Sequence, residues 1–139
     1  MELAQFSAQM RAVSPEAPPT VEAIYAAGHW LLEQEQPENA ARVFRVMVHA
    51  APGDERGWLG LGECHRRIGQ HRIALELLGT GSVVASPSPR CEIARGRALR
   101  ALEREDEAET AFERAMDLAD ACDDEELFAI AVAEKGGRS

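Results

Sequence analysis

The sequence has few cysteines and few aromatic residues, and it lacks a long apolar run. Its three cysteines, Cys64, Cys91 and Cys122, are odd in number and show no CxxC spacing, which argues against a disulfide framework and against a zinc site. No run of about eighteen apolar residues occurs, and the N-terminus lacks a basic region followed by an apolar stretch. We therefore expect reduced thiols, no membrane insertion and no secretory signal.

Basic residues are also in deficit, because the formal net charge is −9 and the sequence pI is near 4.9. Such a chain repels phosphate backbones, so nucleic acid is not an expected partner. Aromatic residues make up only 5%, while alanine, leucine, glutamate and arginine dominate, a composition that favours helices packed through small side chains. With 45% apolar residues in a chain of 139, the sequence predicts a single all-α domain.

A catalytic site would need a nucleophile with a base, paired carboxylates in a pocket, a phosphate-binding loop or a metal cluster. None of these patterns is recognisable in the sequence. Cys64 and Cys91 fall at positions where buried structural thiols are common, and the acidic run from Asp123 to Glu126 suits the first turn of a helix. We therefore expect no enzymatic activity, no catalytic residue, no metal and no cofactor.

A repeat of 34 residues is the strongest signal in the sequence. Three sets of residues keep this interval: Gly28, Gly62 and Gly96; Ala40, Ala74 and Ala108; and Phe44, Leu78 and Phe112. The order within each unit resembles the tetratricopeptide repeat, with a small residue at position 8, alanine at 20, a large apolar residue at 24 and, in the first unit, Pro52 at 32. Positions 8 and 20 are expected where the two helices of a hairpin cross, with large residues filling the space around them.

The repeat predicts a right-handed superhelix of three helical hairpins, a C-terminal capping helix and a short N-terminal arm. The arm is residues 1–20, helical or mobile, and the repeat domain is residues 21–139, with repeats at 21–54, 55–88 and 89–122. Helices are expected over 21–34, 38–51, 55–68, 72–85, 89–102 and 106–119. The capping helix is expected over about 123–135, with Asp123 or Asp124 as its N-cap and Leu127, Phe128 and Ile130 packing on the stack.

Positions 2, 5, 9 and 12 of each first helix face the inside of such a superhelix. The apolar members of this set are Tyr25, Leu32, Leu59 and Ile93, and they lie among polar and charged residues: Glu22, His29, Arg56, Glu63, Arg66, Arg90, Arg97 and Arg100. The pattern predicts a groove for an extended peptide that has spaced apolar anchors and some acidic character. An ordinary solvated face would look similar, because arginine is common on exposed helices, and this alternative stays open.

A more specific pattern lies in residues 58–90, WLGLGECHRRIGQHRIALELLGTGSVVASPSPR. A bulky residue precedes LGLG, one residue and a cysteine; then follow GQ, a second helix centred on Ala74, and Pro89-Arg90 at the start of the third repeat. In these features, and in the first hairpin with Tyr25, the sequence resembles the class II chaperones of bacterial type III secretion, also called translocator or low-calcium-response chaperones. The resemblance covers roughly residues 21–119.

This resemblance implies a cytoplasmic, ATP-independent chaperone that keeps hydrophobic translocator subunits soluble before secretion by holding an extended segment in its groove. The positions carried over by the resemblance are Tyr25, His29, Leu32, Leu59 and Ile93. Members of the family often dimerise through the N-terminal region. A weak homodimer through residues 1–20 is expected here, because Leu3, Phe6 and Met10 have no repeat of their own to cover. Two alternatives stay open: a chaperone for a needle-type subunit, and a protein-interaction scaffold of another pathway.

Overall fold

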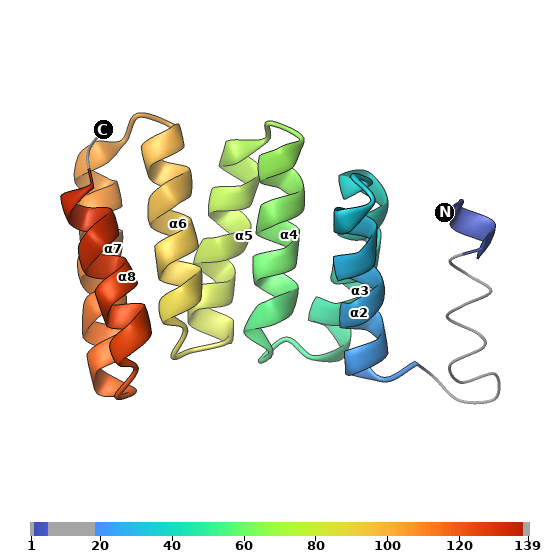
Figure 1. Ribbon diagram of the computed structural model, residues 1–139, viewed down its shortest axis with the longest axis horizontal. Coiled ribbons are helices and arrows are strands. Elements are labelled where there is room, and N and C mark those ends of the chain that lie inside the picture. Colours follow the sequence, from blue (N-terminus) through green and yellow to red (C-terminus); the bar gives the residue numbers. More distant parts are fainter. Residues whose placement is uncertain (1, 6–18, 138–139) are drawn as a thin grey trace.

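The computed structural model describes residues 2–5 and 19–137, and this part of the chain is helical, without strands (Figure 1). Three helical hairpins follow one another in a single stack, and one more helix packs against the last of them (Figure 1). The all-α architecture of tetratricopeptide type is therefore confirmed. The expected arm falls mostly outside the described residues. The helices are α2 (Val21–Glu33), α3 (Pro37–Ala50), α4 (Glu55–Arg67), α5 (His71–Val84), α6 (Pro89–Ala101), α7 (Glu105–Ala121) and α8 (Glu125–Gly136).

The helix bounds lie within two residues of the predicted ones, and each hairpin uses the same turn. After the first helix of the second hairpin, the N–H of Gly69 donates to the carbonyl of Arg66 at 3.0 Å, and the N–H of Gln70 donates to the carbonyl of His65 at 2.8 Å. This bonding satisfies the last carbonyls of the helix and requires a left-handed residue. Such a residue ends each first helix at the repeat interval: Glu35 (φ 57°), Gly69 (φ 85°) and Glu103 (φ 61°).

The glycines of the repeat make room for a large side chain of the same hairpin. A Cβ built on Gly96 would lie 2.5 Å from the ring of Phe112, closer than real Cβ contacts allow. The small residue at position 8 thus accommodates the large residue at position 24, while the alanines at position 20 are buried beside them. The two equivalent approaches are Gly28 to Phe44 at 2.7 Å and Gly62 to Leu78 at 2.8 Å.

The third repeat keeps the fold although Glu92 replaces the bulky Trp58 of the second repeat. The carboxylate of Glu92 is buried between α5 and α6, where it accepts a hydrogen bond of 2.6 Å from the hydroxyl of Ser82 and lies 3.5 Å from Arg95. A buried carboxylate is tolerated when such partners satisfy it. Polar contacts therefore take over packing that is apolar in the other repeats.

The last helix, α8, begins at Glu125 and is capped by Asp124, whose carboxylate accepts a hydrogen bond of 3.0 Å from the N–H of Leu127. Leu127 is buried and Ile130 is partly buried, as expected. Phe128 is less covered than Leu127, because 37% of it is exposed, and it lines a pocket beside Ala119 and Asp120 of α7. Phe128 lies about 100° around the helix from Leu127, so the two side chains contact different parts of the stack.

Within the described residues, none of the helices combines the length and the apolar character that a membrane span requires.

Candidate protein-binding groove

The first helices α2, α4 and α6 lie next to one another, which brings the predicted groove positions onto one face of the stack. We call this face the groove. The apolar residues at the predicted groove positions differ in burial: Tyr25 and Leu59 are half-buried, whereas Leu32 and Ile93 are buried. The polar positions remain at the surface, with His29, Arg66, Arg90 and Arg97 exposed and Glu63 and Arg100 half-buried.

A cleft of about 650 Å³ lies between α4, α5 and α6. Many of its lining residues are glycine or alanine. Because these side chains are small, the neighbouring helices leave space between them that a side chain of another molecule can enter. Four of the predicted groove residues are present, and α5 supplies a floor that the sequence reading did not include. The cleft is lined by Leu59, Gly62, Glu63, Arg66, His71, Ala74, Leu78, Ala94, Arg97, Ala98 and Ala101.

A second cleft, of about 260 Å³, lies where α6 meets α8. It shares Leu59, Ala94 and Arg97 with the first cleft, so the two spaces are neighbours along the groove. Its other lining residues are Arg90 and Ile93 from α6 and Leu127 and Ile130 from α8. The contribution of α8 was missed at the level of the sequence, although Leu127 follows Ile93 by 34 residues, the same interval that connects Tyr25, Leu59 and Ile93.

Tyr25 and His29 line a separate, shallow pocket of about 410 Å³ on α2. The two rings lie 6.0 Å apart, and His29 also pairs with Glu33 at 2.8 Å, one helical turn further on. The structure therefore does not place Tyr25 in the same cleft as Leu59. Leu32 belongs to the buried core of the first hairpin instead of to the surface.

The arginines of the groove are paired with carboxylates of the same chain. Arg56 connects consecutive hairpins: it donates to Glu22 at 2.7 and 3.0 Å and to Asp54 at 2.8 Å, and its guanidinium lies 4.6 Å from the centre of the Tyr25 ring. The hydrogen bond from Arg56 lowers the pKa of both carboxyls below their usual values. The other pairs are Arg66 with Glu63 at 2.6 Å, Arg90 with Glu55 at 3.0 Å, Arg97 with Glu134 at 2.7 Å, and Arg100 with Glu105 at 2.9 Å and Glu134 at 3.3 Å.

These pairs change the electrostatic reading of the groove. Most of the charged residues at the predicted groove positions are arginines, whereas in the fold each of these arginines is paired with a carboxylate. A repeat-length spacing identifies two of the pairs, Glu22 with Arg56 and Arg100 with Glu134. An acidic ligand would therefore compete with a carboxylate of this chain for each of these arginines.

Two of the three thiols are built into the core. Burial raises the pKa of Cys64 to about 12 and the pKa of Cys91 to about 11, so both stay protonated at neutral pH. Cys122 is exposed at the end of α7. Within residues 2–5 and 19–137, histidine, cysteine and carboxylate side chains nowhere form a group of three or more that could hold a metal ion.

No protein-family model and no curated protein matches this chain. Solved structures do: PcrH from Pseudomonas aeruginosa is 28% identical, with a TM-score of 0.76 over 86% of this chain and 92% of that chain. PcrH in complex with the chaperone binding region of PopB gives 28% identity and a TM-score of 0.75 over 85% and 96%. The Yersinia enterocolitica type III secretion chaperone SycD, in complex with a peptide of the translocator YopD, gives 25% and 0.74 over 86% and 92%. The predicted resemblance is confirmed: this chain has the fold of the class II translocator chaperones of type III secretion and is similar to them in sequence.

Proposed function

We propose that the chain is a chaperone of bacterial type III secretion that acts in the cytoplasm and binds a segment of a hydrophobic translocator in its groove, keeping the translocator soluble before secretion. The observation that carries this proposal is the cleft between α4, α5 and α6, whose wall combines apolar and very small residues. Such a cleft removes an apolar side chain from water at a gain of roughly 25 cal/mol for each Å² buried.

The similar solved structures support the choice of partner. PcrH was crystallised with the chaperone binding regions of PopB and PopD, and SycD with a peptide of the translocator YopD. Leu59 occupies the centre of the groove in the present fold, because it lines both clefts. We propose Leu59 as the main apolar anchor site, with Tyr25 forming a separate contact surface on α2.

SycD has also been crystallised as an alternative dimer. We propose that self-association of the present chain is weak and involves residues 1–20, whose apolar side chains include Leu3 and Phe6. Light scattering on the full chain and on a variant that begins at residue 20 tests this point. If the two chains had equal masses, after allowing for the deletion, the arm would have no role in self-association.

The groove is tested by co-expressing the chain with a candidate translocator subunit from the same genome and measuring the translocator in the soluble fraction. The variant Tyr25→Ala with Leu59→Ala is expected to lose the soluble translocator while helicity and Tm stay near wild type, because both side chains are only half-buried. Arg45→Ala with Glu76→Ala is the matched control, since both residues are exposed on second helices. A control variant that loses the translocator, with a groove variant that keeps it, would place binding elsewhere.

A further inference from the structure

The C-terminal helix stands where a fourth repeat would begin. Residue 123 is the first position of that repeat, and Leu127 takes the position that Tyr25, Leu59 and Ile93 hold in the first three. Helix α8 lies on the same side of the stack as the first helix α6 and next to it (Figure 1). By sequence period and by location, α8 is therefore an additional first helix, without a second helix of its own among the described residues.

The orientation of α8 differs from that of the first helices. Position 9 of a repeat holds His29, Glu63 and Arg97 at or near the surface, whereas α8 has Ala131 there, fully buried. Ala131 and Leu127 belong to the same buried cluster as Ile93 of α6 and Phe112 of α7. The face that the other first helices expose is therefore turned towards α6 and α7 in α8. Helix α8 closes that end of the groove.

Closing the groove creates an apolar space. Ile93 is only 4% exposed and lines the cleft of about 260 Å³ together with Leu127 and Ile130 of α8. Two arginines, Arg90 and Arg97, also line this cleft, and each is paired with a carboxylate of this chain, Glu55 or Glu134. The chemistry of the cleft therefore suits an uncharged, apolar side chain better than an acidic one.

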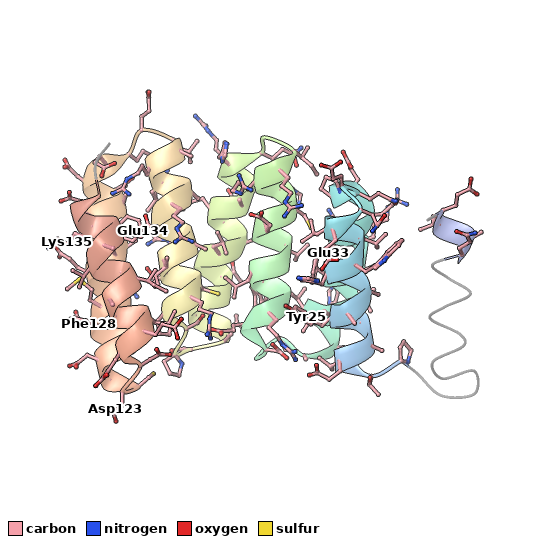
Figure 2. All side chains as sticks on the ribbon, in the orientation of Figure 1. Tyr25, Glu33, Asp123, Phe128, Glu134 and Lys135 are labelled. Atoms are coloured by element: carbon pink, nitrogen blue, oxygen red, sulfur yellow. The ribbon has the colours of Figure 1, made fainter. Side chains whose placement is uncertain are left out.

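The position of α8 is fixed by contacts with groove residues. Glu134 pairs with Arg97 at 2.7 Å and with Arg100 at 3.3 Å, and Arg100 donates to the backbone carbonyl of Glu134 at 3.0 Å. A second ion pair, between Lys135 of α8 and Glu113 of α7, holds the other side of the helix; its two atoms are 3.0 Å apart. Figure 2 shows Glu134 on the side of α8 that faces α6, and Lys135 on the outer side. These contacts form the cleft before any ligand enters, which lowers the entropy cost of binding.

We propose that α8 is a wall of the binding groove and that the cleft between α6 and α8 binds one bulky apolar side chain of the translocator segment. This inference rests on the proposed function and adds a site to it. The occupant follows from continuity: the cleft shares Leu59, Ala94 and Arg97 with the larger cleft, so one segment lying along the groove reaches both. Helix α8 therefore contributes to the choice of cargo as well as capping the stack.

The test fills the cleft from Ile130, a residue that is only partly buried. Ile130→Trp places an indole in the cleft, while Val132→Trp makes the same change on the same helix at a residue that is 43% exposed and does not line the cleft. The probe is the co-expressed translocator, followed by a fluorescent peptide made from the translocator segment that the complex protects from proteolysis. We expect Ile130→Trp to weaken peptide binding about tenfold or more and Val132→Trp to change it less than about twofold.

A second measurement does not depend on how well the tryptophan is tolerated. Ile130→p-benzoylphenylalanine should crosslink to the translocator on illumination, whereas Val132→p-benzoylphenylalanine should not. Wild-type affinity in Ile130→Trp, or equal crosslinking from both positions, would overturn the role of α8. The proposed function would still stand if Tyr25→Ala with Leu59→Ala lost the cargo. A wild-type chain that binds no translocator would instead refute the proposed function itself.

Discussion

The ring of Phe44 in α3 fills the space beside Gly60 in α4, where a Cβ would lie 2.5 Å from two of the ring carbons. The same ring also approaches Gly28 in α2, so it is enclosed between the first helices of two consecutive hairpins. Gly60 is not part of the 34-residue glycine set. Its function is to let the second hairpin approach the first, and the absence of a side chain sets that distance.

Replacing Gly60 by alanine should therefore destabilise the protein, although helix propensity alone would favour alanine by about 1 kcal/mol. We expect a net loss of about 1 to 3 kcal/mol in the free energy of unfolding, because the added methyl group forces either the Phe44 ring or the backbone to move. Gly136→Ala is the control, since nothing lies within 4 Å of its Cβ position. Urea denaturation measures both, and equal stabilities would show that α3 and α4 are not in close contact here.

Glycine should increase the stability of the fold where a non-glycine residue in the left-handed conformation ends a first helix. Glu35 and Glu103 have positive φ values of 57° and 61°, a conformation that costs a residue with a Cβ about 1 kcal/mol or more. Glu35→Gly and Glu103→Gly should each stabilise the fold by about 0.5 to 1 kcal/mol, after allowance for the greater freedom of glycine in the unfolded chain. Gly69→Ala, at the equivalent turn, should have the opposite sign. Thermal and urea unfolding of the three variants check the signs.

How far the sequence alone predicts this fold depends on whether a feature repeats. Gly28, Gly62 and Gly96 set the register, and with it the helix bounds, because one interval fixes every hairpin at once. The left-handed turn at Glu103 was equally predictable by alignment with Gly69, yet glutamate gives no local signal for it. The difference in burial between Leu127 and Phe128 could not be predicted from the sequence, because it depends on how α8 packs against α6 and α7.

The candidate site was predicted less completely than the fold. Positions within a repeat located Leu59 and Arg97 on the groove, but they say nothing of which charges are neutralised. Pairing depends on neighbouring helices, as in the contact of Arg56 with Glu22 across two hairpins. The 34-residue interval could have predicted that Leu127 lines the groove. This position was overlooked because α8 lacks the rest of the repeat pattern.

The thiols should differ in reactivity. Burial raises the pKa of Cys64 to about 12 and that of Cys91 to about 11, so at pH 8 almost none of either is the reactive thiolate. Cys122 is exposed. A disulfide reagent such as Ellman's reagent should therefore modify one thiol rapidly in the native protein and all three in denaturant. Rapid modification of three thiols under native conditions would mean that the core opens easily.

The ion pair between Glu63 and Arg66 should make stability depend on pH. The hydrogen bond from Arg66 lowers the pKa of Glu63 from its usual 4.5, so the contribution is present above about pH 4.5 and is lost as the pH falls through the folded-state value. Both side chains are partly exposed, which limits the effect to less than about 1 kcal/mol. Glu63→Gln should be less stable than wild type at pH 6, and the difference should shrink at pH 3. A difference that grows on acidification would contradict the assignment.

The two sets of ion pairs that hold α8 should have separable effects on motion and on binding. Glu134 of α8 pairs with Arg97 and Arg100 of α6 on the groove side, and Lys135 of α8 pairs with Glu113 of α7. Either Glu134→Gln or Glu113→Gln should increase amide hydrogen exchange in α8 at low salt. At about 1 M salt, where screening extends to roughly 3 Å, the variants should approach wild type.

Binding should distinguish the two variants. Of these two carboxylates, Glu134 is the one that pairs with Arg97, which lines both clefts. Glu134→Gln therefore frees this guanidinium to move across the space that an apolar side chain would fill. We therefore expect Glu134→Gln to weaken binding of the translocator peptide at least a few-fold, and Glu113→Gln to leave it near wild type despite similar exchange in α8. If both variants weakened binding equally, the mobility of α8 would be the cause, and the ion pair with Arg97 would have no separate effect on the groove. If neither variant weakened binding, the role of α8 would be limited to capping the stack.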